Sequence, residues 1–115
     1  MKNKTSSEHS EQTGFINWFR YKYPDVLCFA IPNGGFRSIH TAKILKEEGV
    51  VPGVPDLFIP EWKIFIEMKR TKGGNVSKEQ KAMIEYLNRI GYTAFVANGA
   101  TEASRKILDF VKEKK

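Results

Sequence analysis

Three residues of the chain have the types and the spacing needed to hold a divalent cation next to a phosphate. Asp56 precedes a short apolar segment, and Glu67 and Lys69 alternate along the following one. If residues 60–63 form a four-residue loop between paired strands, Asp56 lies directly opposite Glu67 on the same face. Two facing carboxylates repel each other, so this arrangement indicates a hard cation such as Mg²⁺ between them. Lys69 would then orient or deprotonate an attacking water.

The same residues also have an interpretation without chemistry. Glu67 and Lys69 could form a solvated ion pair on a strand, and Asp56 could be an ordinary loop residue after Pro55. The surrounding pattern favours the functional interpretation, because a Gly-Val-Pro-Asp turn and a short hairpin lead into the sequence Phe-Ile-Glu-Met-Lys.

Two further polar residues are candidates for the same site. Glu11 lies four residues before Phe15, on the edge of an apolar helix face, and could be a third acid that reaches the metal or its water. It could equally be a carboxylate favoured by the dipole of its own helix. Gln80 has the capping-box spacing from Ser77, and it could also lie beside Lys69 and contact the water.

Glycine pairs and basic residues predict contacts with a polyanion. Gly34 and Gly35 follow an apolar strand and could form only a turn, or their backbone without side chains could let a phosphodiester approach closely. Each basic residue near this loop or near Gly73-Gly74 could follow a nucleic-acid backbone or simply be solvated. The candidates for phosphate contact in these two regions are Arg37, Lys43, Arg70, Lys72 and Lys78.

Composition restricts the class of protein. The 115 residues, with 41% hydrophobic and 28% charged residues, are typical of one globular domain. The net charge of +6 indicates either a polyanionic partner such as nucleic acid or a surface that is basic for solubility alone. The single cysteine, Cys28, excludes an intramolecular disulfide, and its apolar surroundings predict a buried, inert thiol. His9 and His40 lack partners at metal-ligand spacing. Without a leader or a membrane-spanning run, we expect a cytoplasmic protein with no membrane partner.

Helices and strands must alternate to position these residues. We predict helices over residues 7–23, 37–48, 77–90 and 101–113, and strands over 26–31, 56–59, 62–69 and 92–97. The apolar run 26–31 predicts a buried strand. Residues 1–115 should form a single α/β domain with a central mixed sheet flanked by helices, and residues 1–6 a mobile N-terminus.

The ordered set of motifs resembles a known nuclease superfamily. Pro55-Asp56 and Glu67-Met68-Lys69 are similar to the two halves of the PD-(D/E)XK signature. A larger set resembles the VRR-NUC branch of that superfamily: Pro32-Asn33-Gly34-Gly35, Arg37, Gly53-Val54-Pro55-Asp56-Leu57 and Glu67-Met68-Lys69.

This resemblance implies a restriction-endonuclease-like core. It implies Mg²⁺ or Mn²⁺ held by Asp56, Glu67 and the backbone carbonyl of Met68, with Lys69 catalytic. It also supports Glu11, since similar nucleases carry a first-helix glutamate near the site. Single-domain members of this kind resemble phage or bacterial enzymes that act as homodimers on branched DNA, including Holliday junctions.

The sequence therefore predicts a metal-dependent DNA endonuclease that hydrolyses phosphodiester bonds, selective for branched DNA. A non-catalytic DNA-binding module with the same fold is one alternative, although it has no need for two repelling carboxylates. A nuclease directed to flaps or nicks is another. A sequence-specific restriction-type enzyme is less compatible with the short chain, which leaves little room for a base-reading insertion.

Overall fold

A computed structural model of the chain describes residues 7–32 and 39–114. The order of elements is the predicted one, and the bounds differ from the prediction by a few residues at most, except in the first strand. The elements are α1 (Glu8–Lys22), β1 (Phe29–Ala30), α2 (Ile39–Glu47), β2 (Leu57–Ile59), the 3₁₀ helix η1 (Pro60–Trp62), β3 (Ile64–Lys69), α3 (Lys78–Arg89), β4 (Thr93–Asn98) and α4 (Ala100–Lys114).

The four strands form one mixed sheet in the order β1-β2-β3-β4. The β1–β2 and β2–β3 pairs are antiparallel, whereas β3 and β4 are parallel. Ile59 pairs with Ile64, so the predicted four-residue loop and its register are confirmed. The same register, continued by one position beyond β2, brings Asp56 opposite Glu67.

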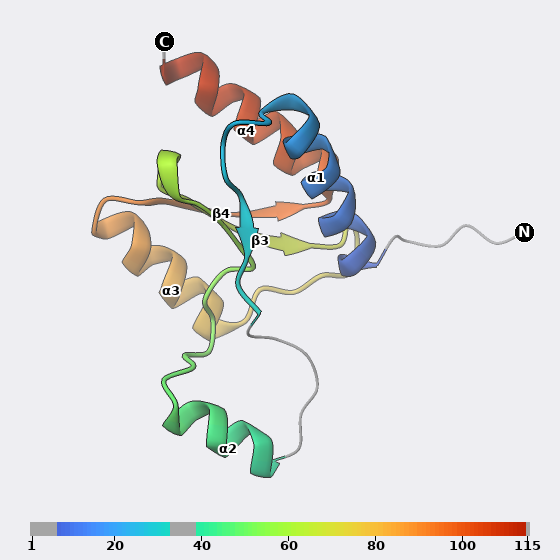
Figure 1. Ribbon diagram of the computed structural model, residues 1–115. Helices are drawn as coiled ribbons and strands as arrows, with labels where there is room; N and C mark the ends of the chain where they lie inside the picture. The colour runs from blue at the N-terminus through green and yellow to red at the C-terminus, as the bar shows by residue number, and fades with distance from the viewer. Residues whose placement is uncertain (1–6, 33–38, 115) are drawn as a thin grey trace, which may run out of the picture.

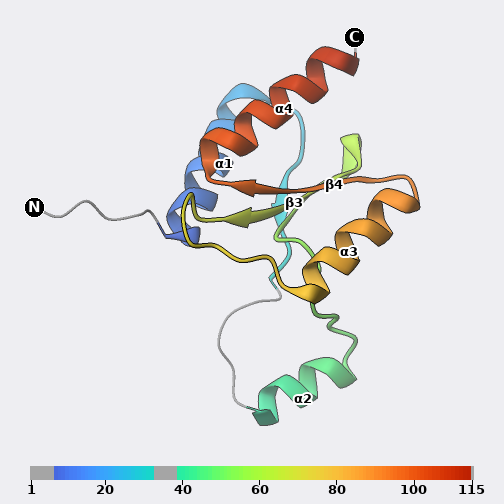
Figure 2. The same cartoon turned by 180° about the vertical axis from the view of Figure 1, so that it is seen from behind.

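Helices cover both faces of this sheet (Figures 1 and 2). Helices α1 and α4 pack against each other and against β3 on one face, and α3 packs against β4 on the other. Helix α2 projects away from the sheet and buries none of its residues. This arrangement confirms the predicted α/β class with a central mixed sheet and flanking helices.

The hydrophobic core lies between the sheet and the α1–α4 pair. Ile64, Ile66 and Met68 alternate along β3 and are fully buried against Phe15 and Phe19 of α1. Burial of each such side chain stabilises the fold by about 2 kcal/mol, and a slip of one residue would turn all three toward the opposite face. The core therefore fixes the direction in which the intervening residues of β3 point.

Local capping signals define the ends of two helices. The Ser7 hydroxyl accepts a hydrogen bond of 3.0 Å from the Ser10 amide and begins α1 where the sequence predicted. Thr5, which has capping-box spacing from Glu8, lies outside the described residues. At α3 the predicted capping box of Ser77 and Gln80 is complete.

The prediction of a buried strand over residues 26–31 is wrong. Only Phe29–Ala30 form a strand, both residues are exposed, and Leu27 is 61% exposed. The reason is that β1 is the edge of the sheet and pairs only with β2. Cys28 is the buried residue of this run and Val26 is partly buried against the core, which confirms the predicted burial of the cysteine. Burial raises the pKa of the Cys28 thiol to about 11, which favours the unreactive protonated form.

Within the described residues, none of the helices combines the length and the apolar character needed to cross a membrane.

Candidate active site

Strand β3 carries two charged residues on the face opposite the core, and both are buried. Glu67 is 2% exposed and Lys69 is 7% exposed, and their Oε2 and Nζ atoms lie 3.5 Å apart. The alternative of a solvated ion pair is therefore wrong. Asp56, half-buried beside them, accepts a hydrogen bond of 2.8 Å from the Met68 amide through Oδ2. The three residues on which the sequence argument rested thus converge at the C-terminal half of β3.

Gln80 connects the start of α3 to Glu67 on β3. Its Oε1 accepts a hydrogen bond of 2.9 Å from the Ser77 amide, and its Nε2 donates one of 3.0 Å to Oε2 of Glu67. The capping-box interpretation of Gln80 is therefore confirmed, its partner in the site is Glu67 and not Lys69, and its contact with a water stays a prediction. The capping box fixes the side chain, and the fixed side chain holds the carboxylate.

The electrostatic environment disfavours charge on both acids. Burial raises the pKa of Glu67, the negative charge of Asp56 raises it further, and the positive charge of Lys69 opposes them, with a result of about 8. Burial also raises the pKa of Asp56, against the hydrogen bond from the Met68 amide. Perturbed carboxylates of this kind cluster at functional sites.

One carboxylate oxygen of Glu67 makes no hydrogen bond to the described residues. Among the residues that the structure describes, Oε1 of Glu67 is buried and has no hydrogen-bond partner. Buried acceptors are normally satisfied, so an unpaired one beside a second carboxylate has the chemistry of a cation ligand. Mg²⁺ commonly uses one or two carboxylates together with water and substrate oxygens. No group of three or more His, Cys, Asp or Glu residues able to hold a metal occurs in the described ranges, so a cation would need such additional oxygens.

Glu11 is engaged at the N-terminus of α4 in this structure. Its Oε1 accepts a hydrogen bond of 2.7 Å from the Ala100 amide, where the helix dipole favours a negative charge. The neighbouring Gly99 amide donates to the backbone oxygen of Lys69 at 2.9 Å, so Glu11 lies close to the end of β3. A ligand role for Glu11 stays a prediction.

The Asn98-Gly99 turn before α4 was predicted from the sequence, but its position beside the end of β3 was not. Asn98 donates from Nδ2 to the backbone oxygen of Arg70 at 3.2 Å, next to the Gly99–Lys69 hydrogen bond. Together they hold the end of β3 in place. The Asn98-Gly99 dipeptide signals a turn, but the parallel β3–β4 pairing that brings this turn to Lys69 has no local signal.

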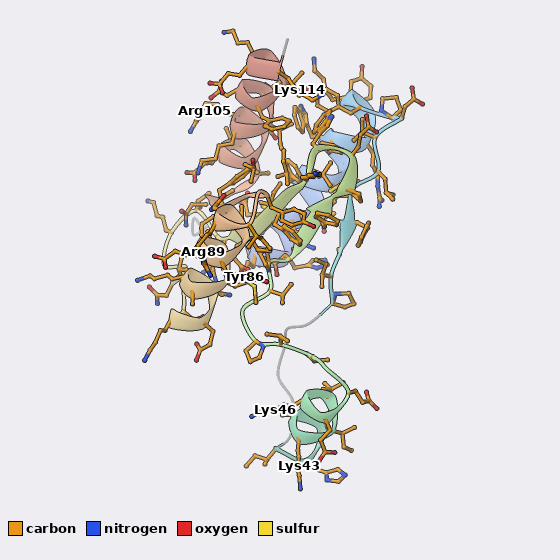
Figure 3. All side chains as sticks on the ribbon, turned by 90° about the vertical axis from the view of Figure 1, so that its left-hand side faces the viewer. Lys43, Lys46, Tyr86, Arg89, Arg105 and Lys114 are labelled. Carbon is orange, nitrogen blue, oxygen red and sulfur yellow. The ribbon has the colours of Figure 1, made fainter. Side chains whose placement is uncertain are left out.

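The predicted phosphate contacts lie in different parts of the molecule. Three of them lie outside the described residues: Gly34, Gly35 and Arg37. Lys43 is on α2 with Lys46, away from the sheet (Figure 3). Arg70 donates to the Gly73 backbone oxygen at 3.0 Å, which orders the loop after β3. The exposed members of this group are Lys43, Arg70, Lys72 and Lys78.

Comparison with known proteins agrees with this geometry. Residues 6–101 match the VRR-NUC domain. A solved structure described as a VRR-NUC domain protein is 27% identical, with a TM-score of 0.78 over 96% of this chain and 92% of that one. No curated protein matches the chain. The family match covers most of the sequence and includes Asp56, Glu67 and Lys69, and on this ground the chain belongs to the VRR-NUC family of nuclease domains.

Proposed function

We propose that this chain is a divalent-metal-dependent endodeoxyribonuclease. Membership of a nuclease family makes DNA the expected substrate, and the metal dependence is our own extension. The observation that carries it is the pair of buried carboxylates with one unpaired oxygen, Oε1 of Glu67, beside a buried lysine. A module that only bound DNA would gain nothing from this arrangement, because buried acids cost stability and repel phosphates.

Asp56 and Glu67 would hold the cation, Mg²⁺ or Mn²⁺, with the backbone carbonyl of Met68 as a further ligand. When bound, such a cation lowers the pKa of a coordinated water and offsets negative charge on a phosphate. For this the raised pKa of Glu67 requires that its carboxyl group release a proton on metal binding. We propose Glu11 as an additional group near the site, once released from the Ala100 amide.

The remaining residues orient groups and balance charge. Gln80 donates to Oε2 of Glu67, which leaves Oε1 as the oxygen available to a ligand. Lys69 brings a positive charge within 3.5 Å of the same carboxylate, and its Nζ is suited to orient a water or to stabilise charge on the phosphate.

Branched DNA, including Holliday junctions, is the substrate class that we propose, with action in the cytoplasm of a bacterial or phage-infected cell. The β2–β3 and β4–α4 connections are short, and this economy of loops near the site favours recognition of DNA shape. Symmetric cutting of a junction needs two active sites related by a twofold axis, so we propose a homodimer.

A cleavage panel tests the proposal. Junction, flap, nicked, duplex and single-stranded DNA are incubated with Mg²⁺, Mn²⁺ or a chelator, using the wild type, Glu67→Gln and Lys69→Ala. The exposed Glu61 and Lys63 near the hairpin loop provide matched controls, Glu61→Gln and Lys63→Ala. We expect the wild type and both control variants to cleave the junction in the presence of metal. Glu67→Gln and Lys69→Ala should lose this cleavage.

The rival functions give different patterns in this panel. Salt-dependent DNA binding without cleavage in either metal would identify a non-catalytic module. Preference for flaps or nicks over junctions would replace the proposed substrate and retain the chemistry. Unchanged cleavage by folded Glu67→Gln and Lys69→Ala would show that the assigned site is wrong.

A further inference from the structure

Gly53 touches the backbone of the first turn of α3. Its φ is +92°, and a Cβ atom placed on it would lie 2.5 Å from the carbonyl oxygen of Glu79 and 2.7 Å from the carbonyl carbon. Non-bonded atoms do not approach so closely, and neither partner atom is part of a flexible side chain. Only a residue without a side chain allows this contact.

The contact joins the turn that leads to Asp56 to the first turn of α3, which carries Gln80. Gly53 lies three residues before Asp56, and Glu79 directly precedes Gln80, whose amide nitrogen would lie 3.1 Å from the same Cβ position. The capping box fixes the Gln80 side chain to its own turn, so this side chain moves with the backbone of the turn. The closeness of Gly53 to the turn therefore sets how far Gln80 reaches toward Glu67.

Other glycines show that φ alone does not explain this position. Gly49 and Gly91 have φ values of +102° and +108°, and a Cβ on either would meet nothing within 4 Å. At these two positions glycine serves the helix end that precedes it. At Gly53 a second requirement, the close approach of α3, is added to the positive φ.

We propose that Gly53 is a positioning residue: it lets α3 approach closely enough for Gln80 to hold Glu67 with one oxygen free. As far as it concerns metal binding, this inference rests on the proposed function. A side chain at residue 53 would push the turn outward by about 1 Å, a displacement large enough to break a 3.0 Å hydrogen bond to Glu67.

The test compares Gly53→Ala with Gly49→Ala, which imposes a similar φ strain without a collision. The first readout is the solvent exchange of the Gln80 side-chain amide in the metal-free protein, followed by NMR. We expect faster exchange in Gly53→Ala and wild-type behaviour in Gly49→Ala. Equal exchange in the two variants would overturn the proposal.

The second readout is Mn²⁺ affinity, measured by calorimetry in a double-mutant cycle with Gln80→Ala. Gly53→Ala should weaken Mn²⁺ binding about tenfold more than Gly49→Ala, and this difference should vanish when Gln80 is already alanine. A difference that persists in the Gln80→Ala background would show that Gly53 does not act through Gln80.

Failure of the proposed metal-dependent function and failure of the Gly53 inference give different results. If the wild type binds no Mn²⁺, the metal-dependent function fails, whereas amide exchange in the metal-free protein still tests Gly53. If Gly53→Ala does not fold, the metal-free wild type provides the test by NMR. We expect a nuclear Overhauser contact between an α-proton of Gly53 and the Gln80 backbone amide, together with slow exchange of the Gln80 side-chain amide, and the absence of either would overturn the proposal.

Discussion

The side-chain amide of Gln80 donates a 3.0 Å hydrogen bond to Oε2 of Glu67, while the other oxygen of this carboxylate has no partner among the described residues. The two oxygens of one buried group are therefore in different situations. One is held by a hydrogen bond, and the other is the oxygen that we propose as a metal ligand. This asymmetry explains why Glu67 should respond differently in the metal-free and metal-bound protein.

Glu67→Gln should stabilise the metal-free protein and abolish metal binding. The variant removes a carboxyl group whose ionisation is unfavourable next to Asp56, and the amide oxygen can still accept from Gln80. We expect a higher Tm than the wild type at pH 9 without metal, and no Tm increase on addition of Mn²⁺. Thermal unfolding with and without Mn²⁺ measures both effects. A lower Tm in the metal-free state would contradict this account of Glu67.

Metal affinity should depend steeply on pH. In the proposed site the cation would need ionised Glu67, and burial together with Asp56 raises the pKa of this group to about 8. Mg²⁺ affinity should therefore rise about tenfold per pH unit from pH 6 to about 8 and level off above it. Calorimetry in two buffers with different ionisation enthalpies should also detect about one proton released per site below pH 8.

The free energy of unfolding of the metal-free protein should fall as the pH rises, whereas the metal affinity rises. Glu67 binds its proton more tightly in the folded chain, with a pKa of about 8, than at its ordinary value of 4.5. Its contribution is therefore fully present below pH 4.5 and is lost as the pH rises through about 8. Urea unfolding of the wild type and Glu67→Gln should show this loss only in the wild type. Equal pH profiles would exclude Glu67 as its source.

Lys69→Ala should separate chemistry from metal binding. The positive charge of Lys69 lowers the pKa of Glu67, so its removal should also weaken Mg²⁺ binding near neutral pH. At pH 9.5 more of Glu67 is ionised, and Mg²⁺ affinity should approach that of the wild type. Cleavage should remain about 10²- to 10⁴-fold slower if Lys69 acts on the water or the phosphate. Recovery of cleavage together with affinity would limit Lys69 to an electrostatic effect on Glu67.

Glu11→Ala should destabilise the fold through α4. The Glu11 carboxylate accepts from the Ala100 amide at 2.7 Å, and loss of a helix cap costs roughly 1 kcal/mol. Glu8→Ala is the matched control, because Glu8 is an exposed residue in the first turn of α1, the helix that carries Glu11. Urea unfolding measures the expected loss. Mg²⁺ calorimetry on the same variant tests the ligand role, since a loss of affinity as large as that of Asp56→Asn would identify Glu11 as a ligand.

The parts of this site that the sequence could predict are those encoded over short distances. Asp56 lies opposite Glu67 because a four-residue loop sets the hairpin register. The Gln80 side chain is fixed at the start of α3 by a capping box. Glu11 meets Ala100 across 89 residues of sequence, and Gly53 meets Glu79 through packing. Contacts of this kind depend on how helices dock on the sheet, which periodicity does not encode. For the same reason, the apolar run around Phe29 gave no sign that it forms an edge.

Removal of single exposed lysines near the end of β3 should weaken DNA binding uniformly. Lys72, in the loop that follows Lys69, and Lys78, at the start of α3, are both exposed, and we expect each to contact a phosphate and not a base edge. Lys72→Ala and Lys78→Ala should each reduce the slope of log affinity against log salt by about 1, with no change in preference among DNA sequences. Lys114→Ala, at the far end of α4 (Figure 3), provides the control for net charge alone. Fluorescence anisotropy at several salt concentrations measures the slopes, and equal slopes for Lys114→Ala and the loop variants would show that the loop does not follow the DNA backbone.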